Sequence, residues 1–233
     1  MRWMKVMKDS YRVILAVSLG VIFALALSAP IILSGYSGTI GGQGGAFSGG
    51  ISMMSVQGQT VTVDGAIQMM KNIPGYASLT PSNNTITFTS RDIRLVVLAT
   101  DHDGALNLTG RLPPSYATDD AFVIYGLVDP ALVIPHGAMV HVIVVNLDRD
   151  MYHNFVITAF SPPYSYMAMQ GMMNWQRQGF VQMMPFLPPA SYAQGVARAY
   201  GYNATLNARS SLWYLCTYPG HAQSGMYGEV LVN

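Results

Sequence analysis

The single cysteine, Cys216, is the feature that most narrows what this chain can fold into and do. It ends a strand-forming run, Leu212–Cys216, and is followed by His221 and Met226 in a Cys-x4-His-x4-Met spacing. One cysteine excludes an intramolecular disulfide, a multi-cysteine zinc knuckle and a cysteine-ligated iron–sulfur cluster. A lone cysteine is therefore a buried small side chain, a reactive thiol or a metal ligand.

A further metal-binding side chain, His153, lies upstream in the segment Met151–Phe155. A thiolate and two imidazoles in a trigonal plane, with a thioether as weak axial ligand, form the ligand set of a blue copper site. Pro219 and Gly220 can turn the chain back between the C-terminal donors. We therefore predict a site for one copper ion that cycles between Cu(II) and Cu(I). The predicted ligands are His153, Cys216, His221 and Met226.

Other uses of the cysteine fit the composition less well. A cysteine protease needs a histidine base held by a third group, and structural zinc does not select a thioether. The chain has 5 histidines, too few for the additional centres of a multicopper oxidase or a copper nitrite reductase, and a binuclear copper site needs a second cysteine. We predict that the protein is not an enzyme, and that His102, His136 and His141 are structural or surface groups.

Short runs rich in Val, Ile, Thr, Tyr and Phe alternate with turn signals after residue 50. Such spacing is typical of an antiparallel sandwich or barrel. One helix is predicted at Gly65–Asn72, stopped by Pro74, and the rest is predicted as sheet. The predicted strands are Thr85–Ser90, Arg94–Ala99, Ala121–Leu127, Ala131–Ile134, Val140–Asn146, His153–Thr158, Leu212–Cys216 and Glu229–Val232.

A long Met-rich insertion, Ser161–Ser210, separates two of these strands. A structureless loop of this length is unusual, so we expect short helices of its own or packing across one end of the sandwich. Its methionines either fill gaps in a core or form an exposed docking patch, and uptake of Cu(I) is a third interpretation. They are Met167, Met169, Met172, Met173, Met183 and Met184.

The N-terminal segment Val13–Leu33 contains no charged residue over 21 positions, enough for a helix of about 30 Å across a bilayer. Basic residues precede it, which places the N-terminus in the cytoplasm. We predict a cytoplasmic basic segment at 1–12, a transmembrane anchor at 13–33, a Gly-rich linker at 34–50 and an extracytoplasmic domain at 51–233. A cleaved signal peptide ending near Ser28–Pro30 is the alternative.

Charged residues make up only 10% of the chain, against about 25% in average soluble domains, and the net charge is +1. A protein that binds nucleic acid would show a clustered basic surface, so none is expected as a partner. A fold that depends on apolar burial rather than ion pairs suits an acidic exterior, where carboxylates are protonated. Three triplets, at Asn83, Asn107 and Asn203, match the N-glycosylation acceptor pattern.

Three segments together resemble the cupredoxin family: LCTYPGHAQSGMYGEV at the end, HNFV at His153–Val156, and VIPHG at Val133–Gly137 before a Val-rich run. Within that family the chain is most similar to the sulfocyanins, and more distantly to the rusticyanins. The resemblance covers about Gly65–Asn233. It implies an all-β, cupredoxin-like Greek-key β-sandwich.

The resemblance also implies a role and additional site residues. Sulfocyanins are membrane-associated blue copper proteins that pass electrons between respiratory complexes at the outer face, here from a cytochrome toward a haem–copper terminal oxidase. It implies that the Asn154 side chain bridges the ligand loops, that the Tyr218 amide donates to the thiolate, and that the His221 ring edge near solvent is the electron port. Two alternatives stay open: a cell-surface copper-delivery protein, and a fixed subunit of an oxidase supercomplex.

Overall fold

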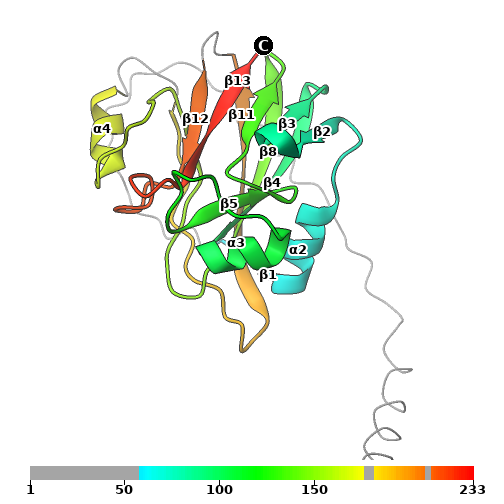
Figure 1. Ribbon diagram of the computed structural model, residues 1–233, viewed down its shortest axis with the longest axis vertical. Helices are drawn as coiled ribbons and strands as arrows, with labels where there is room; N and C mark the ends of the chain where they lie inside the picture. Colours follow the sequence, from blue (N-terminus) through cyan, green and yellow to red (C-terminus); the bar gives the residue numbers. More distant parts are fainter. Residues whose placement is uncertain (1–57, 176–180, 208–210) are drawn as a thin grey trace, which may run out of the picture. The chain divides into compact units, whose positions relative to one another are not determined.

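The computed structural model describes residues 58–175, 181–207 and 211–233, which form two β-sheets packed face to face (Figure 1). The predicted segments at 1–12, 13–33 and 34–50 lie outside the described residues. Within the described ranges, no helix is both long enough and apolar enough to cross a membrane.

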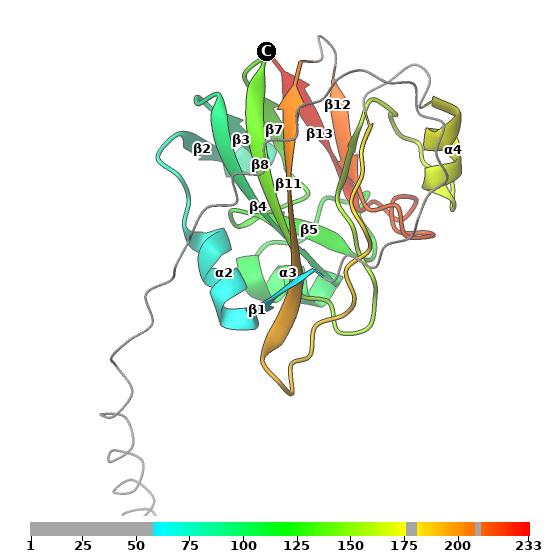
Figure 2. The same cartoon turned by 180° about the vertical axis from the view of Figure 1, so that it is seen from behind.

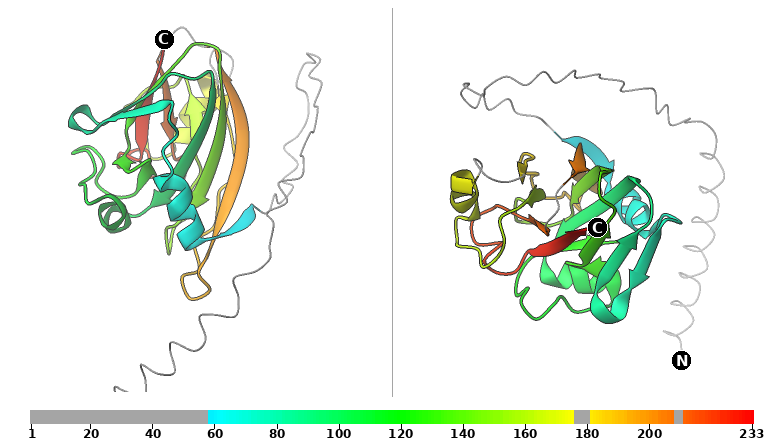
Figure 3. Two further views of the ribbon diagram at one scale, coloured as in Figure 1. Left: turned by 90° about the vertical axis from the view of Figure 1, so that its right-hand side faces the viewer. Right: turned by 90° about the horizontal axis from the view of Figure 1, so that it is seen from above.

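Each strand expected from the sequence has a counterpart in the two sheets, although the predicted run Ala121–Leu127 is divided into two strands. Figure 3 shows both layers from the side. The first sheet has the order β1 (Gln59–Thr62), β11 (Val196–Leu206), β8 (Ala138–Asn146), β4 (Asp92–Thr100), β5 (Ala121–Ile124) and β6 (Leu127–Val128). The second has the order β10 (Val181–Gln182), β9 (Val156–Thr158), β12 (Leu212–Leu215), β13 (Tyr227–Val232), β7 (Ala131–Ile134), β3 (Thr85–Phe88) and β2 (Ala77–Thr80).

The predicted mostly-β sandwich is confirmed, but its strands are not all antiparallel. The pairs β4–β8, β3–β7 and β7–β13 are parallel, because strands from distant parts of the chain meet in each sheet. The predicted strand starting at His153 is also too long. His153 makes only an isolated bridge to Leu187, and β9 begins at Val156, so His153 lies in the loop that follows β8.

The structure contains more helix than predicted. The expected helix is α2 (Val63–Lys71), whose N-cap Thr62 accepts a hydrogen bond from the Gly65 amide. The prediction that the rest is sheet was wrong, since α3 (His102–Thr109), α4 (Ala168–Trp175) and the short 3-10 helix η1 (Pro81–Asn83) are also present. Asp101 caps α3 at its N-terminus and Gly110 ends it in the left-handed conformation, two local signals that the sequence analysis missed.

The Met-rich insertion is divided between a helix and a long strand. As expected, it has a helix of its own, α4, but it also contains β11, which pairs with β1 and β8 inside the first sheet. β11 escaped notice because it is rich in alanine and polar residues rather than in β-branched ones.

Three aromatic rings fill the space between the sheets directly beneath the predicted ligands. Phe122 on β5 packs edge-on against Phe155 and Tyr214, with centroids 5.0 and 5.7 Å away, while Phe155 and Tyr214 stack at 4.9 Å. Tyr214 is fully buried and donates a hydrogen bond to the carbonyl of Pro130 at 2.6 Å. Because Phe155 and Tyr214 each lie two residues from a predicted ligand, this cluster ties the ligand-bearing segments to both sheets.

Helix α4 covers the outer face of the second sheet next to the loop between β12 and β13 (Figures 1 and 2). Met172 and Ala168 of α4 form a small second core with Val156 of β9 and Leu215 of β12. The Leu215 end of β12 is therefore buried on both faces, and the adjoining Cys216 is closed to solvent from the outer side as well.

A glycine in the C-terminal ligand loop provides a test of how tightly that loop is packed. Gly225 has a φ of +104°, and a Cβ there would overlap the backbone of Tyr116 and Ala117. We expect Gly225→Ala to lower the free energy of unfolding by more than the ~1–2 kcal/mol that a left-handed conformation costs. The matched control is Gly126→Ala, at φ +83° with open space around it. Urea unfolding that shows equal losses for the two variants would contradict this packing.

Candidate metal centre

Three of the predicted donor atoms meet in the interior, although they come from two distant segments. His153 Nδ1 lies 3.8 Å from Cys216 Sγ and 3.2 Å from His221 Nδ1, and Cys216 Sγ lies 3.6 Å from His221 Nδ1. A triangle with these sides has a centre about 2.1 Å from each corner, close to the usual length of metal–nitrogen and metal–sulfur bonds. The donors therefore fit one metal ion, and their chemistry is that of type 1 copper.

The loop after β12 places three of the four predicted ligands. The Cys216 amide donates to the Met226 carbonyl at 3.1 Å, and the Met226 amide donates to the His221 carbonyl at 3.0 Å. Gly220, at φ +89°, allows the turn between Cys216 and His221. Met226 is fully buried at the base of this loop, next to both other ligands along the backbone.

The fourth ligand, His153, is held by backbone contacts with a different part of the insertion. Its amide donates to the Leu187 carbonyl at 3.2 Å, and its carbonyl accepts from the Leu187 amide at 2.7 Å. Leu187 is itself buried in the core. This fixes His153 facing the C-terminal loop even though it is not part of a strand.

Asn154 connects the two ligand segments. Its Oδ1 accepts a hydrogen bond from the Thr217 amide at 2.8 Å, and its Nδ2 donates to Thr217 Oγ1 at 2.8 Å. Each partner is the residue that follows a metal ligand, so the bridge expected from the resemblance is present between these two side chains. Removing it would leave buried groups unpaired.

Cys216 is fully buried, but two backbone amides donate hydrogen bonds to its sulfur. Burial raises the pKa of the Cys216 thiol to about 12, and hydrogen bonds from the backbone amides of Asn154 and Tyr218 oppose that rise. The Tyr218 amide was expected at this position, whereas the Asn154 amide was not. Hydrogen bonds to a thiolate withdraw electron density from sulfur and favour the reduced metal.

Two buried carboxyl groups at the site were missed by the sequence analysis. Asp148 Oδ2 lies 3.4 Å from His153 Nε2, and Asp120 Oδ2 lies 3.2 Å from His221 Nδ1. Burial and then the nearby carboxylates raise the pKa of Asp120 to about 8. Burial also acts to raise the pKa of Asp148, but the adjacent His153 and hydrogen bonds from two backbone amides lower it to about 2. The Asp-x4-His spacing of Asp148 and His153 was the available sequence signal.

The expectation that the His221 ring edge reaches solvent was wrong. His221 is only 4% exposed, and its Nε2 is buried. The ring of Tyr218 lies against it with centroids 4.7 Å apart, and Tyr218 in turn stacks on the exposed Tyr152 at 6.4 Å. The two tyrosines stand between this imidazole and the surface.

The remaining histidines are placed away from the site. His141 on β8 contacts Asp92 and Asn203 at 2.8 Å each, near the surface. His102 begins α3, and His136 is exposed in the turn before β8. Neither they nor His141 belongs to a group of metal-binding side chains in the described part of the chain.

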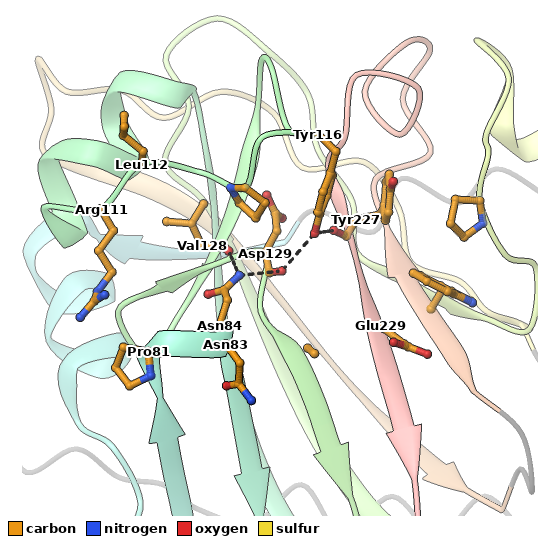
Figure 4. A pocket seen from close by; sticks show the side chains of 14 residues that line it. Pro81, Asn83, Asn84, Arg111, Leu112, Tyr116, Val128, Asp129, Tyr227 and Glu229 are labelled. Atoms are coloured by element: carbon orange, nitrogen blue, oxygen red, sulfur yellow. Dashed lines mark hydrogen bonds between the residues drawn. The ribbon is translucent and has the colours of Figure 1, made fainter.

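A cavity of about 510 Å³ lies on another face, and none of the predicted ligands lines it (Figure 4). Asn84 Nδ2 donates to the Val128 carbonyl at 2.7 Å, and the Tyr116 hydroxyl lies 3.4 Å from the Tyr227 carbonyl. These polar groups of the cavity wall are therefore satisfied by the protein's own backbone.

Comparison with known proteins points to one group. No protein-family profile matches the chain. Rusticyanin from Acidithiobacillus ferridurans is 27% identical over 159 residues, covering 65% of this chain and 69% of that protein. A rusticyanin from Acidithiobacillus ferrooxidans is 26% identical over 159 residues, covering 65% and 83%.

Solved structures agree at the level of the fold. Rusticyanin from Thiobacillus ferrooxidans, determined at 1.27 Å, gives a TM-score of 0.54 at 22% identity and covers 75% of this chain and 96% of that one. Reduced rusticyanin at 1.9 Å gives the same TM-score and identity and covers 75% and 99%. The likeness shows a cupredoxin-like fold.

The pKa of His221 predicts how copper binding responds to acid. Burial, and next the neighbouring His153, lower the pKa of His221 to about 4. This imidazole is thus neutral in the metal-free protein from pH 7 down to about 4, and protons compete for it only below that value. Cu(I) affinity, measured by competition with a chromogenic chelator, should fall more steeply below pH 4 than above it. A Cu(I) affinity that does not fall more steeply below pH 4 would contradict the burial argument for His221.

Proposed function

We propose that the chain is a blue copper electron-transfer protein and not an enzyme. The observation that carries this proposal is the convergence of two imidazole nitrogens and one thiol sulfur at 3.2–3.8 Å in a buried site, with Met226 on the same loop. The relatives support it, since one solved rusticyanin structure is described as that of a copper protein.

The protein's contribution is to hold an unchanging set of donors. A bound copper ion supplies one-electron exchange between Cu(II) and Cu(I). Around it, the Asn154–Thr217 bridge and the His153–Leu187 pairing hold the two ligand segments in register. Ligands fixed by packing and hydrogen bonds shift little when the metal charge changes, which keeps the cost of each transfer low. The amides of Asn154 and Tyr218 favour the reduced state.

Electrons leave the site, we propose, through the tyrosines that cover His221. Tyr218 contacts the His221 ring and stacks on Tyr152, which is 45% exposed. Phe186, also exposed, meets Tyr218 edge-on at 5.7 Å, and the exposed Tyr166 lies against Gly220. These four aromatic side chains carry no charge and suit a brief encounter with a redox partner.

For the cellular role, we propose a sulfocyanin-like carrier at the outer face of the cell membrane. It would be held by a single N-terminal helix at 13–33 and carry electrons between respiratory complexes, from a cytochrome toward a haem–copper terminal oxidase. The support is the uncharged N-terminal segment of the sequence and the four uncharged aromatic side chains above the site. A variant of this role is that of a fixed subunit of an oxidase supercomplex, in which the protein stays bound to the oxidase permanently.

Copper delivery is the competing function, and the exposed methionines are the observation in its favour. Met167 and Met183 are 40% and 38% exposed, whereas Met172 and Met184 are buried, so the insertion serves both packing and surface. Delivery requires ligands that an acceptor can reach. Because Cys216 and His153 are fully buried and His221 nearly so, the site favours electron carriage.

Two substitutions test the proposed function. Cys216→Ser should abolish the intense blue absorption, because that band requires the copper–thiolate bond. Met226→Leu should keep the band and shift the midpoint potential, because it would remove only the thioether, the weakest of the predicted donors. Absorption and paramagnetic resonance spectra of the copper-loaded chain, with a redox titration, measure both effects.

The same measurements separate carriage from delivery. Rapid reversible reduction with copper retained supports the carrier. A wild-type protein without a blue band, or one that loses copper to an acceptor chelator without redox turnover, would refute it.

A further inference from the structure

The two histidines at the site differ in what lies behind their rings. Both present Nδ1 to the other donors, so Nε2 faces away from the metal position. Behind His153, Nε2 faces Asp148 Oδ2 at 3.4 Å, and both side chains are almost completely buried. The ring of His221 has the ring of Tyr218 as a neighbour, with centroids 4.7 Å apart. The carboxyl group near His221 is that of Asp120, and it lies 3.2 Å from Nδ1, the nitrogen that faces the other donors. Asp148 instead faces Nε2 of His153, on the side away from the metal position.

Asp148 is itself held rigidly by its surroundings. Its Oδ1 accepts hydrogen bonds from the amides of Asp150 at 2.7 Å and Met151 at 2.9 Å. Its own amide donates to Asn146 Oδ1 at 2.9 Å, at the end of β8. Two of the four lone-pair positions of the carboxylate are thus used by the loop, and Oδ2 is left directed at the imidazole.

Asn146 extends this framework to the segment that pairs with His153. Its Nδ2 donates to the carbonyls of Met151, Leu187 and Pro188 at 2.9, 3.0 and 3.0 Å. Leu187 is the residue that pairs with the His153 backbone. The backbone and the ring of His153 are therefore set by one connected network.

His153 Nε2 and Asp148 Oδ2 are both buried without a hydrogen-bond partner in the described ranges, and they lie 3.4 Å apart. A buried imidazole N–H needs an acceptor, and this carboxylate oxygen faces the nitrogen that would carry it. With the proton on Nε2, the N–H faces the carboxylate and the Nδ1 lone pair faces the metal position. In the other tautomer, the Nε2 lone pair would face a carboxylate oxygen. The Nδ1 atom would carry the proton and could not bind the metal. Metal-binding histidines commonly donate their second N–H to such a group, which fixes the tautomer and increases ligand basicity.

We propose that Asp148 is a positioning residue that holds His153 as the Nε2–H tautomer and, through its negative charge, makes His153 the stronger imidazole donor of the pair. The proposal rests on the proposed blue copper function. Because a stronger donor and a nearby negative charge both favour Cu(II), Asp148 lowers the reduction potential of the site. This effect of Asp148 on the reduction potential is opposite to that of the Asn154 and Tyr218 amides, whose hydrogen bonds to Cys216 favour the reduced metal.

Three variants of the full chain test this role. Asp148→Asn keeps the shape, removes the charge and leaves one oxygen acceptor in place of two, and Asp148→Ala removes both acceptors. The matched control is Asp150→Asn, which makes the same charge change two residues away at an exposed position. Each variant is compared with the wild type after copper loading.

Asp148→Asn should keep the blue band and raise the midpoint potential clearly more than Asp150→Asn does. Asp148→Ala should bind Cu(I) about 10–100-fold more weakly than the wild type in competition with a chelator, the usual range when the partner of a metal-binding histidine is removed. In ¹⁵N NMR spectra of the Cu(I) form, the wild type should show a slowly exchanging His153 Nε2–H that exchanges rapidly in Asp148→Ala.

The outcomes distinguish this inference from the function on which it rests. A wild-type chain without a blue band refutes the blue copper function itself. A blue wild type whose potential, copper retention and Nε2–H exchange are altered no more by the Asp148 variants than by Asp150→Asn overturns the positioning role alone. If Asp148→Ala does not fold, the potential and NMR spectrum of Asp148→Asn still decide the question.

Discussion

The structure depends on holding three electron-rich donor atoms together in a dry interior. The two imidazole Nδ1 atoms and the Cys216 sulfur lie 3.2–3.8 Å from one another. With their lone pairs directed at one another, such an arrangement is unfavourable unless a cation lies between them. Burial raises the pKa of the Cys216 thiol to about 12, so the same interior that protects the site resists forming the thiolate without a metal. The framework around the donors must therefore be firm before the ion binds.

That firmness comes from contacts between the residues that adjoin the ligands. Asn154 joins Thr217, and Asn146 joins Leu187, each across a wide gap in the sequence. The rings of Phe155 and Tyr214 carry the same connection into the core between the sheets. Helix α4 closes the outer side of β12. The cofactor site is thus an extension of the core, and a change in either affects both.

The sequence predicted the sandwich and most of its strands because their runs of β-branched and aromatic residues reflect burial directly. β11 was missed because an alternation of small and polar residues does not by itself indicate a strand. This segment becomes a strand through its pairing with β1 and β8. The parallel pairs were missed because pairing direction depends on which distant strands meet. The capping residues of α3 were readable, but its short length gave a weak periodic signal.

The sequence by itself determined the chemistry of the centre, because the donor types belong to the side chains and three of them share one short loop. Only the tertiary structure decided that His153 meets that loop, that carboxyl groups of Asp120 and Asp148 reach both imidazoles, and that Tyr218 shields His221 from solvent. These contacts join residues tens of positions apart. Local sequence patterns do not encode such proximity, which arises when the two sheets and the insertion pack together.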